Sequence, residues 1–185
     1  MRFVPTEVPG AWLIEEERFA DERGYFARTW CTREFAANGL EAAVVQCSVS
    51  FNARRGTLRG MHYQAPPRAE VKLVRCTRGA IFDVAVDLRP GSTAFRRWVG
   101  VELTAENGRA LYIPKGFAHG FLTLADETEV FYQMSEFYGP VEARGLRWDD
   151  PFVGVRWPAS PQVMASRDRD YPDVTSDRLE ELRGL

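Results

Sequence analysis

The sequence predicts an all-β fold in which short antiparallel strands form a domain of the jelly-roll type. From Ile81 to Leu88 two sets of residues alternate, which is the period of a β-strand with two different faces. The chain has 185 residues, of which 45% are hydrophobic, so we expect a single domain over residues 1–185 with a buried core. Turn-forming residues recur at the spacing expected in a sandwich or barrel: Gly79, Pro90-Gly91, Asn107-Gly108 and Asp126.

The β pattern extends from Ala43 to about Pro158, after a mixed pattern in residues 1–30. A short helix is expected in the N-terminal third, over Thr32–Gly39, because Thr32 can cap its start and Gly39 its end. A second helix is expected at the C-terminus, over Thr175–Arg183. Further short strands are expected at Val71–Val74, Trp98–Thr104, Ala110–Ile113, Phe121–Leu124 and Thr128–Met134.

Charge and composition exclude several classes of protein. The formal net charge is -2, with 24 basic and 26 acidic residues, which excludes a globally basic nucleic-acid binder. No apolar run approaches the roughly 20 residues of a membrane span, and Glu7 and two prolines interrupt the N-terminus where a signal peptide needs apolar residues. The three cysteines lack C-x-x-C spacing, which fits a reducing compartment. We therefore expect a cytoplasmic protein that binds neither nucleic acid nor membrane.

One segment carries a motif of small jelly-roll barrels. Gly108, Pro114, Gly116 and His119 are spaced as G-x5-P-x-G-x2-H, which resembles the second motif of cupins. The resemblance implies a cupin-like jelly roll in which His119 points into the mouth of the barrel. Metal-binding cupins have a His-x-His pair in their first motif, but Gln64 stands at the second position here, and an amide is a poor ligand beside imidazole.

Glu70 would still complete a site of two histidines and one carboxylate with His62 and His119. A metal-dependent cupin oxygenase is therefore one alternative function. The weaker ligand set favours organic acid–base chemistry and no bound metal.

Longer motifs cover almost the whole chain, in order and at compatible spacings. GTLRGMHYQAPP at 56–67, Lys72 and IPKGFAHGF at 113–121 resemble the dTDP-4-dehydrorhamnose 3,5-epimerase family, and DERGYF at 21–26 and WDDP at 148–151 agree with it. The resemblance implies a cofactor-independent isomerase. Its substrate would be a dTDP-linked 4-keto-6-deoxyhexose, epimerised at carbon 3, carbon 5 or both in deoxysugar biosynthesis.

Epimerisation beside a ketone needs a base, a cation or donor near the ketone oxygen, and an acid on the opposite face. His62 is the candidate base, because neutral imidazole accepts a proton at physiological pH. The resemblance pairs it with Asp168, and Asp83 is the alternative carboxylate that would orient it. Lys72 lies among apolar strand residues and, by the resemblance, would stabilise the enolate. Tyr132 is the candidate acid.

The remaining candidate residues would bind the nucleotide and the sugar. Arg23 and Arg59 match family positions that contact the diphosphate or the sugar, and guanidinium groups suit phosphate oxygens. The family usually has Gln-x-Asn where this chain reads Gln46-Cys47-Ser48, so a hydroxyl replaces an amide. The expected binding residues are Arg23, Phe26, Gln46, Ser48, Asn52, Arg59, His119, Tyr138, Glu142 and Arg167.

Two questions stay open at this point. The sequence does not fix which carbon is epimerised or which final sugar is made. A non-catalytic sugar-binding cupin is a further alternative, although such a protein has no need of Lys72 and Tyr132 together with a base.

The family is usually homodimeric with N-terminal strands crossing the interface, so the resemblance implies that Arg23 or Phe26 enters the partner's pocket.

Overall fold

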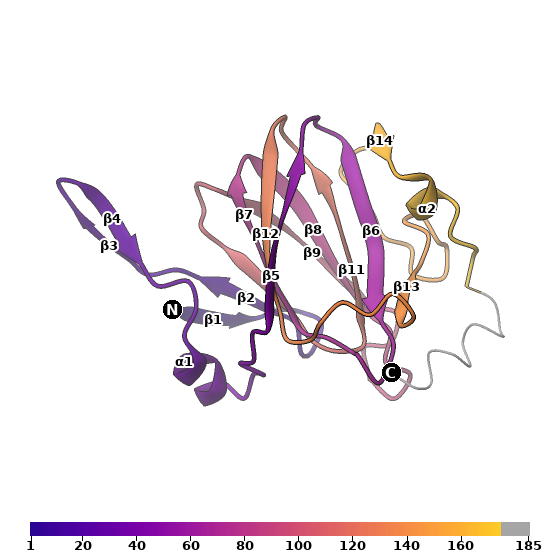
Figure 1. Ribbon diagram of the computed structural model, residues 1–185, viewed down its shortest axis with the longest axis horizontal. Coiled ribbons are helices and arrows are strands. Elements are labelled where there is room, and N and C mark those ends of the chain that lie inside the picture. The colour runs from indigo at the N-terminus through magenta and orange to yellow at the C-terminus, as the bar shows by residue number, and fades with distance from the viewer. Residues whose placement is uncertain (175–185) are drawn as a thin grey trace.

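The computed structural model describes residues 1–174 and confirms the predicted antiparallel β fold, as a sandwich of two sheets (Figure 1). The first sheet has the order β1 (Arg2–Pro5), β2 (Trp12–Glu15), β10 (Ala110–Ile113), β7 (Lys72–Arg78), β12 (Thr128–Met134) and β5 (Gln46–Asn52). The second has the order β13 (Ala143–Gly145), β6 (Thr57–Gln64), β11 (Phe117–Thr123), β8 (Ala80–Asp87) and β9 (Trp98–Thr104). β14 (Val163–Met164) adds to β6 in parallel.

The core lies between the two sheets and consists of inward-facing strand residues. Val74 of β7, Leu111 of β10 and Val130 of β12 pack in one cluster with Ile81 of β8 and Phe121 of β11. All five side chains are fully buried. Burying a large aliphatic or aromatic side chain stabilises a fold by about 1.5–3 kcal/mol, so this cluster joins the two sheets firmly.

β8 confirms the predicted alternating strand, and both of its faces are buried. Ile81 and Ala85 enter the core between the sheets, whereas Val84 and Val86 pack in a second cluster on the other face of the sheet. Asp83 shares the inner face with Ile81 and Ala85, because alternate residues of a strand point the same way. The carboxylate of Asp83 therefore lies inside the sandwich.

The connection before β11 also follows the prediction, with one difference. Gly116 closes the turn at 114–116 with φ +78, a left-handed conformation that glycine adopts without strain. β11 begins at Phe117 and not at Phe121 as predicted, so His119 lies within the strand. Its side chain is therefore held by a backbone that pairs with strands on both sides.

The helices agree only in part with the predictions. α1 (Thr32–Ala37) confirms the first helix, and Gly39 follows it with φ +70 as expected. The prediction that Thr32 caps this helix is wrong, because Cys31 is the N-cap residue and no side chain makes the capping bond. The helix predicted at 175–183 lies outside the described residues. α2 (Ser166–Arg169) is a single turn that the sequence does not predict.

The mixed N-terminal segment contains a hairpin of β3 (Arg18–Asp21) and β4 (Gly24–Ala27) that projects away from the sandwich (Figure 1). Phe19 and Phe26 pair across it and are 68% and 74% exposed. Two large apolar side chains are thus exposed on an arm that has no core of its own. Within residues 1–174, no helix is long and apolar enough to cross a membrane.

Candidate active site

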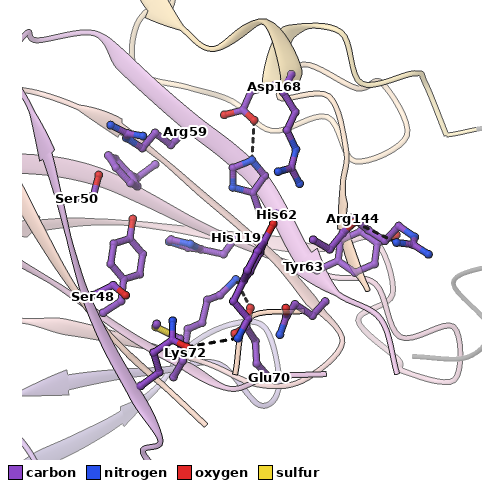
Figure 2. Close-up of a pocket in the computed structure, with 18 of the residues that line it drawn as sticks. Ser48, Ser50, Arg59, His62, Tyr63, Glu70, Lys72, His119, Arg144 and Asp168 are labelled. Atoms are coloured by element: carbon purple, nitrogen blue, oxygen red, sulfur yellow. Dashed lines mark hydrogen bonds and ion pairs between the residues drawn. The ribbon is translucent and has the colours of Figure 1, made fainter. Parts of the chain in front are cut away.

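A pocket of about 370 Å³ opens between the two sheets (Figure 2). Its walls come from β5, β7 and β12 of the first sheet, from β6 and β11 of the second, and from α2. The four predicted catalytic residues line it together: His62, Lys72, Tyr132 and Asp168. The fold thus gathers side chains that lie far apart in the sequence.

His62 of β6 is bound through Nε2 to Oδ1 of Asp168 at 2.7 Å (Figure 2). The other oxygen of this buried carboxylate, Oδ2, accepts a hydrogen bond from the backbone N–H of Gly60 at 3.1 Å. Burial opposes ionisation of Asp168, but His62 and the Gly60 amide outweigh it and hold the pKa of Asp168 below its ordinary value. An ionised Asp168 accepts the Nε2 proton and leaves the Nδ1 lone pair of His62 free to act as a base.

His62 lies opposite His119 where β6 and β11 approach closely. A Cβ at Gly60 would lie 2.5 Å from Cα of Gly120, so neither strand can carry a side chain at this crossing. Gly60 has φ +139, which an L side chain rarely adopts. The two glycines therefore permit the strand spacing that sets the histidines side by side.

His119 forms a second, more deeply buried pair with a carboxylate. Its Nε2 lies 2.7 Å from Oδ1 of Asp83, which is fully buried on β8. Asp83 therefore orients His119, and Asp168 is the carboxylate that contacts His62. Burial raises the pKa of Asp83, although His119 and Lys72 act in the opposite direction. Oδ2 of Asp83 has no hydrogen-bond partner within residues 1–174.

Lys72 begins β7 and reaches the pocket from the first sheet (Figure 2). Its Nζ lies 3.0 Å from Oε1 of Glu70, which also lines the pocket. Both side chains are largely buried, so a carboxylate balances the charge of Lys72.

Tyr132 of β12 lies directly across from Ser48 of β5 and lines the same pocket. Its ring meets the ring of His119 edge to face, with centroids 6.0 Å apart. Burial, with the nearby charge of Asp83, raises the pKa of the Tyr132 phenol well above its ordinary value. The phenol therefore stays protonated and can act as a proton donor.

Most of the predicted binding residues also line the pocket: Gln46, Ser48, Arg59, His119, Tyr138 and Arg167. Asn52 and Glu142 do not. Asn52 is buried behind Arg59, and its Oδ1 accepts a hydrogen bond from Nε of Arg59 at 2.8 Å. Glu142 lies 3.9 Å from Nε of Arg68, outside the pocket lining. Asn52 can thus orient a pocket residue, whereas Glu142 has no direct place in the site.

Arg23 and Phe26 are absent from the pocket of their own chain. Both lie at the projecting hairpin, where Arg23 Nη2 is 2.5 Å from Oδ2 of Asp21. Their predicted contact with substrate therefore requires a pocket other than that of the same chain.

The structure adds pocket residues that the sequence does not predict as binding residues, among them Ser50 and Arg144. Beside the pocket, the Tyr171 ring meets the His62 ring edge to face, with centroids 6.2 Å apart. The Tyr171 hydroxyl accepts a hydrogen bond from Nε of Arg167 at 2.7 Å. A Cβ at Gly145 would overlap the Tyr171 ring, so the missing side chain makes room for it. Ser50 lies two residues after Ser48 on β5, so it shares the face of Gln46 and Ser48. This two-residue repeat is a feature of the sequence that would identify Ser50 as a pocket residue.

Within residues 1–174, no group of three His, Cys, Asp or Glu side chains is arranged to hold a metal ion. Each histidine of the pocket is instead paired with one carboxylate.

The fold and the site define a cupin-like β-sandwich whose pocket between the sheets holds two histidine–carboxylate pairs. The model of the dTDP-4-dehydrorhamnose 3,5-epimerase family matches residues 5–176. The chain belongs to this family of isomerases.

Individual relatives agree over nearly their full length. The dTDP-4-dehydrorhamnose 3,5-epimerase of Methanothermobacter thermautotrophicus is 46% identical over 173 residues, 92% of each chain. The structure of the rmlC epimerase of Mycobacterium tuberculosis matches with a TM-score of 0.92 and 36% identity, over 98% of this chain and 92% of that one. The Bacillus anthracis dTDP-4-dehydrorhamnose 3,5-epimerase with TDP and PPi bound matches with a TM-score of 0.90 and 38% identity, over 94% and 99%.

Proposed function

We propose that this protein epimerises a dTDP-linked 4-keto-6-deoxyhexose at carbon 3, carbon 5 or both, without a cofactor. The observation that carries the proposal is the His62–Asp168 pair, which lines one pocket together with Lys72 and Tyr132. The dTDP part of the substrate is supported by the relative that holds TDP. The protein would serve the biosynthesis of rhamnose or a related deoxysugar.

His62 starts the reaction. Nδ1 takes a proton from the carbon beside the ketone, and the electron pair of that C–H bond forms the enolate. The imidazolium that results is stabilised by the Asp168 carboxylate. Negative charge collects on the former ketone oxygen, where the Lys72 ammonium stabilises it.

Tyr132 completes the inversion. Its phenol donates a proton to the same carbon from the opposite face, the enolate collapses to the ketone, and the tyrosinate regains a proton from water. His62 returns its own proton to water. Both side chains thus return to their starting protonation states, and the reaction involves no net oxidation or reduction.

Substrate recognition combines charge with hydroxyl groups. Arg59 and Arg167 line the pocket and suit the diphosphate, because guanidinium groups form paired hydrogen bonds with phosphate oxygens. On the facing strand β5, Gln46, Ser48 and Ser50 reach the same pocket. The hydroxyl side chains of Ser48 and Ser50 are short, so they leave space in the pocket for the sugar or the nucleoside of the substrate.

A homodimer is part of the proposal, and the projecting hairpin supports it. Phe26 is 74% exposed, and Arg23 lies in the turn between β3 and β4 of the same arm, which leaves its own sandwich (Figure 1). An exchange of arms between two copies would bury the apolar side chains and bring both residues to the partner's pocket. We further propose that residues 1–185 form one domain and that the protein acts in the cytoplasm.

The function is tested with dTDP-4-keto-6-deoxyglucose in deuterated water. Proton NMR should show exchange at carbon 3, carbon 5 or both, and the ring couplings of the product report each stereocentre. Binding of the nucleotide sugar without exchange would indicate a sugar-binding cupin. Stoichiometric iron or manganese in protein purified without chelator would instead favour an oxygenase.

A further inference from the structure

Glu70 and Lys72 form an ion pair that belongs to the pocket itself. Oε1 of Glu70 lies 3.0 Å from Nζ of Lys72, and the two are joined by a dashed line in Figure 2. Residues i and i+2 of an extended chain point to the same side. The carboxylate and the ammonium therefore meet in the pocket, while Val71 between them packs into an apolar cluster with Leu73.

Ser135 fixes the backbone between the two charges. The N–H of Val71 donates a hydrogen bond to Oγ of Ser135 at 2.8 Å. The N–H of Ser135 donates in return to the carbonyl oxygen of Val71 at 3.0 Å. Because this backbone is held on both sides, Glu70 presents its carboxylate to Lys72 from a fixed position.

A second carboxylate, that of Asp83, lies within electrostatic reach of the Lys72 ammonium. Asp83 is fully buried, and its Oδ2 has no hydrogen-bond partner among the described residues. Lys72 is close enough for its charge to act on Asp83. The flexible four-carbon stem of lysine allows the ammonium to swing between acceptors, and an unpaired buried carboxylate oxygen attracts it strongly. The pair with Glu70 is the contact that opposes this movement.

We propose that Glu70 is a positioning residue, which holds the Lys72 ammonium toward the bound sugar and keeps it from pairing with Asp83. The inference rests on the proposed function, because the value of this placement lies in stabilising an enolate. The placement itself can nevertheless be measured without substrate.

The first test uses the two lysines of the chain, Lys72 and Lys115. Protein labelled with 15N at lysine Nζ gives two side-chain signals, which Lys115→Arg assigns. Glu70→Ala should move the Lys72 signal and leave that of Lys115 in place, whereas Glu70→Gln, which retains an oxygen acceptor, should move it less. A Lys72 signal in Glu70→Ala that coincides with wild type would overturn the proposal.

Glu41→Ala is the matched control, because Glu41 lies 2.8 Å from Nζ of Lys115 outside the pocket. It should move the Lys115 signal alone. It should also leave the rate of the reaction unchanged, since neither residue of that pair reaches the substrate.

The second test is kinetic. A misplaced catalytic group typically costs about a hundredfold in rate, so Glu70→Ala should lower kcat for deuterium exchange by about 10- to 100-fold. KM should change by less than about threefold, because the loss falls on the transition state. Glu70→Gln should recover most of the rate, and an equal loss in both variants would overturn the proposal. An absence of exchange in wild type would instead contradict the proposed function, and the lysine signals would still test the placement.

Discussion

His62 and His119 lie opposite each other on neighbouring strands, yet each is bound through Nε2 to a different carboxylate at 2.7 Å. The two pairs differ in access to water, because the His62 side chain is 37% exposed and that of His119 is 6% exposed. A base must exchange its proton with solvent between turnovers. The geometry therefore favours His62–Asp168 as the proton-transfer pair and His119–Asp83 as a fixed wall of the pocket.

Tyr132→Phe should separate proton removal from inversion. The variant keeps His62 and Lys72, so deuterium should still enter the substrate from the side of the base, while formation of the epimer falls by about 10²- to 10⁴-fold. Within residues 1–174 no hydrogen bond to the Tyr132 hydroxyl is present, so stability should change little. Proton NMR in deuterated water measures both processes. Inversion at the wild-type rate would contradict the role of Tyr132 as acid.

Asp168 should contribute to the pH dependence of stability. Its pKa is lower in the folded protein than in the unfolded chain, so its ionised form stabilises the fold above the unfolded value of about 4. This contribution is lost as the pH falls through the folded pKa. The free energy of unfolding should therefore fall more steeply for wild type than for Asp168→Asn between about pH 5 and pH 3.

Urea unfolding at several pH values measures this difference. Asp170→Asn is the control, because Asp170 is an exposed carboxylate next to the same helical turn. Its curve should run parallel to that of wild type. Parallel curves for Asp168→Asn and wild type would show that the carboxylate gains nothing from His62 and Gly60.

Gly145→Ala should disturb the site indirectly. The new Cβ would overlap the Tyr171 ring, which contacts His62 and accepts a hydrogen bond from Arg167. We expect a loss of about 1–3 kcal/mol in stability, typical of overpacking, and a lower kcat/KM. Thermal unfolding and exchange kinetics measure the two effects. Gly91→Ala is the control, because a Cβ there meets nothing within 4 Å, and equal behaviour of the two variants would contradict the packing argument.

Mixed subunits should test the exchange of hairpins. Arg23→Ala and His62→Ala are each expected to be weakly active alone. The rate of His62→Ala should be lower than that of wild type by about 10²- to 10⁴-fold. If Arg23 serves the partner's pocket, a heterodimer contains one site with both native residues. Unfolding the two variants together and refolding the mixture should therefore restore activity. Light scattering checks that dimers form. Mixtures no more active than the two separate variants would contradict the exchange.

The sequence predicts the strands well because their patterns are local. The alternation at 81–88 and the turn at 114–116 each follow from a few neighbouring residues, and both are present. The start of the first helix is not predictable in this way, because Thr32 and Cys31 compete for the capping position. α2 is a single turn, too short to leave a periodic pattern.

The site residues follow the same division. His62, Lys72 and His119 stand out because the chain contains two histidines and two lysines. Asp168 lies 106 positions from His62, so its pairing was predicted from the family resemblance and not from spacing. The contact of Glu70 depends on which carboxylate lies nearest to Lys72 in the fold. The position of Tyr171 depends on the missing side chain at Gly145. Such features exist only in the folded chain.

The central claim is that His62 removes the proton beside the ketone. The most direct measurement compares deuterium incorporation into dTDP-4-keto-6-deoxyglucose by wild type and by His62→Ala, with circular dichroism to check that both are folded. Wild type should incorporate deuterium at carbon 3, carbon 5 or both, and the variant should be slower by about 10²- to 10⁴-fold. Exchange by folded His62→Ala at the wild-type rate would contradict the account.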